Sequence, residues 1–160
     1  PNWNPMWFTT DHFPRKLLHL PRHPYVRMNT LMPDSVEQRI QAKDILIEPL
    51  AAEIEMDHDR YTVAEVRITN RSSHTLGSFL ANGSPMRLAY HLLAEDGTIL
   101  LAEGSRTELE IDLPPGGSHV QGVVIERPVK RGTYHLQIDL LTEGRRWWGL
   151  NVPMTVHAGW

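Results

Sequence analysis

Hydrophobic and polar residues alternate along most of the chain from about residue 45 onward. The clearest segment is 134–140, where aromatic and aliphatic residues at the even positions alternate with His135, Gln137 and Asp139. A period of two residues is typical of a β-strand that has one face in a core. The sequence therefore predicts a half-buried strand here, and Glu143-Gly144 predicts the turn that follows it.

Further segments with this pattern, separated by turn residues, predict more strands. They are Ile45–Glu55, Tyr61–Asn70, Arg87–Glu95, Thr98–Ala102, Glu108–Leu113, His119–Glu126 and Gly149–His157. Asp96-Gly97 is the strongest hairpin signal, and Pro49 indicates a sheet edge or a bulge. Because no helical crossovers separate the strands, we expect an all-β fold. It is an antiparallel, immunoglobulin-like or jelly-roll β-sandwich of about eight or nine strands.

The first 33 residues have a different composition. They hold six of the twelve prolines and several aromatic residues, namely Trp3, Trp7, Phe8, Phe13 and Tyr25. Proline interrupts helices and sheet ladders, whereas disordered segments contain few aromatic residues. We therefore expect residues 1–33 to be an extended arm that lies along the domain or a partner, and residues 34–160 to be the sandwich. A short helix, capped by Asp34 or Ser35, is predicted to reach Lys43.

Charge and composition exclude several function classes. The formal net charge is −3, so we expect no nucleic-acid partner. The chain has no cysteine, which excludes disulfides, thiolate metal sites and cysteine nucleophiles. No apolar run approaches about 18 residues, so no membrane span is expected. The lack of cysteine fits a reducing compartment, so we expect a cytoplasmic protein. Because the chain opens at Pro1 rather than Met, we expect an excised segment of a longer protein.

The sequence contains no recognisable catalytic motif. No His-x-His pair occurs, and His12, His19 and His23 in the arm are interpreted as solvated residues rather than metal ligands. There is no Gly-x-Ser-x-Gly nucleophile motif and no glycine-rich phosphate loop before a helix. We expect a non-enzymatic module without a metal or cofactor.

The chemistry that remains is recognition. Trp148 is in phase with Leu150 and Val152 and is expected in the core, which leaves Trp147 for the surface. Indole and guanidinium planes suit sugar rings, and polar side chains bind their hydroxyls. The candidate carbohydrate-binding residues are Trp147, Arg106, His91, Glu143, Arg145 and His135. Alternatively, Arg106 has a structural role and pairs with Asp139 or Glu143 across strands.

A series of short motifs recurs in order along the last 95 residues or so. They are VRITN at 66–70, PMRLAYH at 85–91, GSRT at 104–107, LPPG at 113–116, GTYHLQIDL at 132–140 and the run from Glu143 to Trp148. Together they resemble the immunoglobulin-like domains of bacterial surface-polysaccharide proteins. They are similar to the carbohydrate-binding C-terminal domain of O-polysaccharide ABC transporter ATP-binding subunits, and to related modules on glycosyltransferases and methyltransferases. The resemblance implies glycan binding and a homodimer, and it implies no catalytic residue in the module.

Two hypotheses follow from these observations. In the first, the chain is a non-catalytic module that recognises the end of a bacterial polysaccharide of the O-antigen type. It would serve an export or biosynthesis protein at the inner face of the membrane. In the alternative, it is a structural or dimerisation module that docks on a neighbouring domain or a second copy without a ligand.

Overall fold

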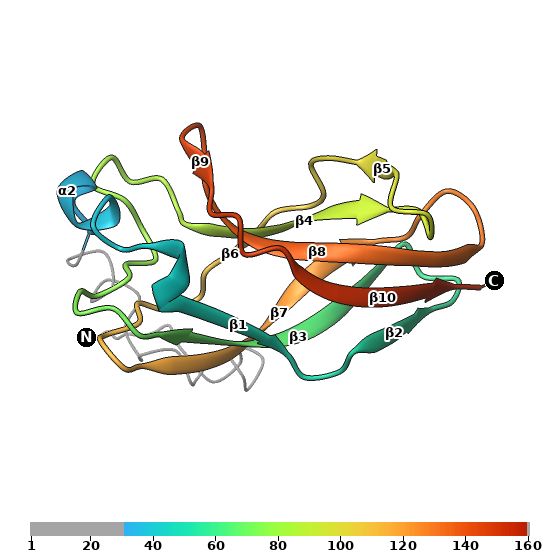
Figure 1. Ribbon diagram of the computed structural model, residues 1–160, viewed down its shortest axis with the longest axis horizontal. Helices are drawn as coiled ribbons and strands as arrows, with labels where there is room; N and C mark the ends of the chain where they lie inside the picture. The colour runs from blue at the N-terminus through green and yellow to red at the C-terminus, as the bar shows by residue number, and fades with distance from the viewer. Residues whose placement is uncertain (1–30, 160) are drawn as a thin grey trace, which may run out of the picture.

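The computed structural model describes residues 31–159, which form two β-sheets packed face to face (Figure 1). The smaller sheet has the order β1 (Ile45–Pro49), β3 (Tyr61–Asn70), β7 (Ser118–Glu126). The larger sheet has the order β2 (Glu53–Met56), β10 (Val152–Ala158), β8 (Gly132–Thr142), β4 (Arg87–Leu93), β5 (Ile99–Leu101). Two short strands extend it: β6 (Thr107–Glu108) pairs with β4, and β9 (Arg146–Trp147) pairs with β8. The all-β sandwich predicted from the alternation is confirmed.

The core lies between the two sheets. The alternate residues Ala64, Val66 and Ile68 of β3 face it from one sheet, and the even-numbered residues of β8 from 136 to 140 face it from the other. Tyr90 of β4 links the layers, because its hydroxyl accepts a hydrogen bond from the Glu126 backbone N–H of β7 at 3.0 Å. A buried tyrosine needs such a partner for its hydroxyl.

The predicted strands agree with the structure most closely where one face is buried and the other is solvated. The segment Tyr61–Asn70 is β3 over the predicted range. The predicted strand Ile45–Glu55 is instead two strands in different sheets, with Pro49 as the last residue of the edge strand β1. The expectation of purely antiparallel pairing was wrong at one place, since β2 pairs with β10 in parallel. Ten strands are present among the described residues, one more than the larger expected number.

The predicted strand Glu108–Leu113 was wrong over most of its length. Only Thr107–Glu108 forms a strand, because the Gln121 side chain occupies the backbone groups that a neighbouring strand would pair. Its amide oxygen accepts from the Glu110 N–H, and its amide nitrogen donates to the Glu108 carbonyl, each at 3.0 Å.

The helix predicted to reach Lys43 is shorter in the structure. Helix α2 spans Asp34–Glu37, and a separate 3-10 turn, η2, spans Ala42–Asp44. Pro33 rather than Asp34 or Ser35 is its N-cap, and no side chain caps it. The Asp34 carboxylate instead pairs with Arg145 at 3.1 Å.

The predicted arm and its histidines lie outside the described residues, apart from residues 31–33. Met32 of this stretch is buried in the core and forms a parallel bridge with Leu80. Over residues 31–159, no helix has the length and hydropathy needed to cross a membrane.

Candidate functional site

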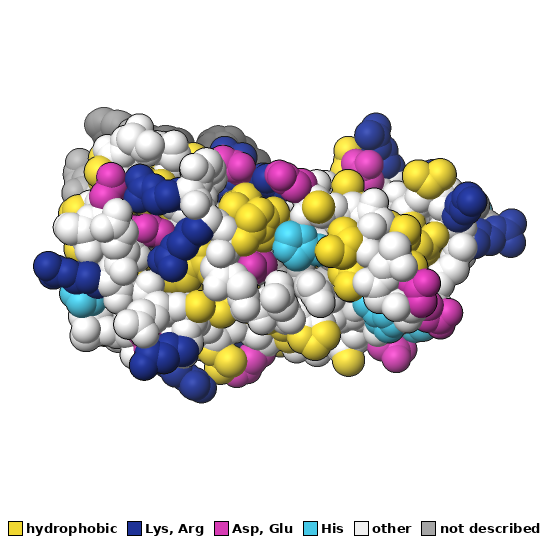
Figure 2. All heavy atoms as spheres, turned by 45° about the horizontal axis from the view of Figure 1, so that its top comes forward, with side chains coloured by type: hydrophobic (Ala, Val, Ile, Leu, Met, Phe, Trp, Pro, Cys, Tyr) yellow, Lys and Arg dark blue, Asp and Glu magenta, His cyan; other side chains and the backbone are white. Residues whose placement is uncertain are grey.

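The outer face of the larger sheet positions most of the candidate residues. His91 of β4 lies opposite Gln137 of β8, and Trp147 of β9 lies opposite Leu141 of β8. Residues 137 and 141 share one face of β8 because side chains alternate along a strand, so His91 and Trp147 share that face too. Figure 2, which brings the top of Figure 1 forward, shows hydrophobic side chains around a histidine near the middle of the molecule.

Trp147 is the centre of this cluster. Its ring lies against the His91 ring, with 4.3 Å between centroids and 34° between planes. The Arg106 guanidinium carbon lies 5.5 Å from the indole centroid, which is within the range of a cation–π contact. Trp147 is half-buried, so these contacts hold the indole in place while part of it still faces solvent. The predicted surface position of Trp147 is therefore consistent with the structure.

Arg106 is held by hydrogen bonds through all three guanidinium nitrogens. Nε donates to Glu143 at 3.2 Å, Nη2 donates to Glu103 at 2.6 Å, and Nη1 donates to the Gly104 carbonyl at 2.9 Å. The hydrogen bond from Arg106 lowers the pKa of Glu143, and the same bond raises the pKa of Arg106. Arg87 adds a second positive charge 3.9 Å from Glu143. The predicted pairing of Arg106 with Glu143 is confirmed.

The loop of residues 103–106 is positioned by a close contact between the Gly104 backbone and Tyr90 of β4. The Gly104 N–H donates to the Tyr90 carbonyl at 2.9 Å, and a Cβ on Gly104 would lie 2.5 Å from the Tyr90 ring. Only glycine fits there without a shift of the ring. His91, next along β4, contacts the same segment through Nδ1, which donates to the Ala102 carbonyl. The loop and β4 therefore fix His91 and Arg106 relative to each other.

Arg145 lies apart from this cluster. It pairs with Asp34 at 3.1 Å and with Glu37 at 3.5 Å, both on α2. Arg146 also reaches α2, where its Nε donates to Glu37 at 3.1 Å. Arg145 thus forms ion pairs with α2 rather than joining the cluster. The alternation of residues along the strand did not indicate this.

His135 lies on the same outer face but farther along β8. Its register partners are Leu93 of β4 and Thr155 of β10. The structure therefore brings together four of the six candidate residues, namely His91, Arg106, Glu143 and Trp147. Glu103 and Arg87 complete the cluster and were not predicted. The position of Glu103 three residues before Arg106 was the sequence feature that could have indicated their ion pair.

Two further predictions concerned the core around the site. Trp148 is buried as predicted, and its Nε1–H donates to the Thr142 hydroxyl at 3.0 Å. Asp139 lies on the same face of β8 as Gln137, as the alternation predicts, but it is not solvated there, because its side chain is fully buried. Its carboxylate accepts from the backbone N–H groups of Leu140, Gly149 and Leu150 at 2.8–2.9 Å. These bonds satisfy the buried charge and fix the turn before β10.

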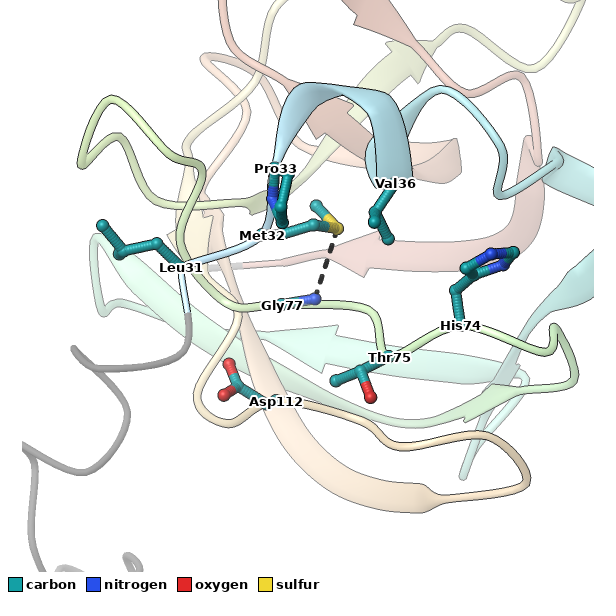
Figure 3. A pocket seen from close by; sticks show the side chains of 8 residues that line it. All are labelled: Leu31, Met32, Pro33, Val36, His74, Thr75, Gly77 and Asp112. Carbon is teal, nitrogen blue, oxygen red and sulfur yellow. Dashed lines mark hydrogen bonds between the residues drawn. The ribbon is translucent and has the colours of Figure 1, made fainter.

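A pocket of about 310 Å³ lies elsewhere, beside α2 (Figure 3). Met32, Pro33 and Val36 line one side, and His74 and Gly77 line the other. The Gly77 N–H donates to the Met32 sulfur at 3.4 Å across it. Its wall is mostly apolar, and none of the six predicted site residues lines it. Among residues 31–159, no group of three or more His, Asp or Glu side chains is placed to hold a metal ion.

Comparison with known proteins gave only distant structural similarity. No known protein family matches the chain, and no curated protein matches it. A beta-glucosidase from Listeria innocua in complex with glucose is similar over 72% of this chain and 16% of its own, at 10% identity and a TM-score of 0.44. The chain thus spans a small part of that enzyme. The C-terminal domain of wzt is similar over 72% of this chain and 70% of its own, at 10% identity and a TM-score of 0.40.

Proposed function

We propose that this chain is a non-catalytic carbohydrate-recognition module of a bacterial surface-polysaccharide export or biosynthesis protein. It binds the end of a glycan on the outer face of the larger sheet and acts in the cytoplasm. The observation that supports this most directly is the fixed, partly exposed indole of Trp147, held by His91 and Arg106. An immobilised aromatic ring beside polar groups suits the C–H faces and hydroxyls of a sugar. The sequence resemblance to glycan-binding sandwich modules points the same way.

The chemistry around Trp147 favours binding over catalysis. Glu143 and Glu103 both accept hydrogen bonds from Arg106, so both carboxylates are paired to a single guanidinium. Glycoside hydrolysis uses two carboxyl groups that flank the scissile bond. A pair shared by one arginine does not provide that arrangement.

The test is glycan binding by the 160-residue chain and a Trp147→Ala variant. Titration calorimetry with bacterial O-polysaccharides should give saturable binding for the wild type and at least a tenfold loss for the variant, because an aromatic–sugar contact is removed. Val120→Ala, an exposed apolar position on the other sheet, is the matched control and should leave the affinity unchanged. Equal affinity of wild type and Trp147→Ala would refute the site, and no binding to any such glycan would refute the function.

The second candidate function is a structural module that pairs with a second copy. The specific observation is β5 at the edge of the larger sheet, whose three residues are all exposed and apolar: Ile99 60%, Leu100 52% and Leu101 41%. Exposed apolar edge strands favour pairing with another strand. Sedimentation of wild type and Leu100→Lys tests this, since a dimer through β5 should become a monomer in the variant. A monomeric wild type, or a dimer unaffected by the substitution, would contradict it.

A further inference from the structure

We infer that the cluster around Trp147 selects neutral glycans over acidic ones. The inference rests on the proposed function and adds a substrate class to it. It follows from which polar groups of the cluster are already paired and which face the solvent.

The guanidinium that lies against the Trp147 ring, that of Arg106, is already occupied. Proteins recognise carboxylate and phosphate groups with the paired N–H groups of arginine. Arg106 uses these groups internally, because Nε and Nη2 bond Glu143 and Glu103 while Nη1 bonds the Gly104 carbonyl. A ligand anion bound by these Arg106 groups would have to displace a carboxylate that belongs to the protein.

The acids of the cluster are also more exposed than its arginines. The side chains of Glu103 and Glu143 are 65% and 40% exposed, whereas that of Arg106 is 20% exposed. Arg87, the second cation, is 30% exposed. An incoming ligand therefore meets carboxylate oxygens first. These oxygens accept hydrogen bonds from sugar hydroxyls and repel uronate, phosphate or sulfate groups.

The neutral form of His91 also offers an acceptor. Its Nδ1 donates to the Ala102 carbonyl, so the neutral ring has its lone pair on Nε2. Together with the exposed carboxylates, this gives the surroundings of the indole a set of acceptors that matches a ligand rich in hydroxyl donors.

The experiment measures binding of the 160-residue chain to matched polysaccharides by affinity electrophoresis at low salt. The neutral probes are mannan, dextran and laminarin, and the acidic probes are alginate, polygalacturonate and hyaluronan. One like-charge contact at about 4 Å in water weakens binding by about fivefold, so we expect at least one neutral probe to bind about fivefold more tightly than every acidic one.

A pair of double variants separates the local effect from net charge. Glu103→Gln/Glu143→Gln leaves Arg87 and Arg106 without carboxylate partners, so binding to acidic probes should rise about tenfold. The control Glu48→Gln/Glu126→Gln removes the same formal charge from acids of the other sheet and should not produce this gain.

Each outcome has a defined meaning. Preference for a neutral probe, with acidic binding gained only in the site variant, supports the inference. Acidic probes that bind the wild type as tightly as neutral ones, with Trp147→Ala abolishing that binding, overturn the inference and leave the proposed function standing. No binding to either set overturns both.

Discussion

A buried carboxylate joins helix α2 to the end of the larger sheet, and its removal gives the sharpest test of what holds this region together. Glu37 is 1% exposed. Its Oε2 accepts from the Thr142 hydroxyl at 2.8 Å and from Arg146 Nε at 3.1 Å, while Oε1 faces Arg145 at 3.5 Å. The Thr142 hydroxyl in turn accepts from buried Trp148, so the contacts extend from the helix into the core.

The substitution Glu37→Gln keeps the shape and removes the charge. Both carboxylate oxygens face donors, so the amide nitrogen must point at another donor in either orientation. A hydrogen bond to a charged group contributes about 1.5–3 kcal/mol, and one between neutral groups about 0.5–1.5 kcal/mol. With two bonds to Oε2 weakened by about 1 kcal/mol each, the variant should lose about 2 kcal/mol of unfolding free energy.

The assay is urea unfolding monitored by tryptophan fluorescence. An m-value equal to that of the wild type shows that the substitution has changed stability alone. Asp34→Asn is the matched control, because Asp34 lies on the same helix and pairs with the same Arg145 but has a side chain 55% exposed. An exposed pair contributes about 0–1 kcal/mol, so the control should lose less than half as much as Glu37→Gln. Equal losses, or a loss below about 0.5 kcal/mol for Glu37→Gln, would refute the argument from burial.

Two further predictions concern the cluster itself. Gly104→Ala should cost about 1–3 kcal/mol of unfolding free energy by urea unfolding, because its Cβ would lie 2.5 Å from the Tyr90 ring. Gly159→Ala, with nothing within 4 Å, should be neutral, and a similar loss in both would contradict the steric reason. Arg106 lowers the pKa of Glu143, so this pair stabilises the fold above the carboxyl's unfolded pKa and its contribution is lost as pH falls through the lower folded value. Glu143→Gln should therefore show a shallower fall in stability below about pH 4.5 than the wild type, and parallel curves would contradict the pairing.

Much of the sandwich could be predicted because its long strands each have one buried face. In β3 the residues Ala64, Val66 and Ile68 are buried and their neighbours are not, which is the pattern that the sequence displays. The same reasoning placed Trp148 in the core. It did not predict the burial of Asp139, because a carboxylate that accepts hydrogen bonds from three backbone N–H groups has no distinctive local pattern.

The site was predicted only in part, because its contacts depend on turns and on partners distant in sequence. Arg145 would share a face with Trp147 if strand alternation continued. It lies instead in a turn, where its backbone N–H donates to the Thr142 carbonyl. Its side chain therefore follows the turn toward α2. The link between Arg146 and Glu37 spans 109 positions, a separation that leaves no local trace in the sequence.

The parallel pairing of β2 with β10 has a consequence for synthesis of the chain. His157 on β10 bonds Glu53 on β2, and 104 positions separate them. At about 5–20 residues per second, the ribosome takes roughly 5–20 s to deliver the strand that β2 needs. During that interval β2 lacks its neighbour, because β10 lies between β2 and β8 in the finished sheet. The outer edge of β8 waits only briefly for the same strand, because Gly132–Thr142 is made shortly before Val152–Ala158. The larger sheet therefore closes only after β10 has been made.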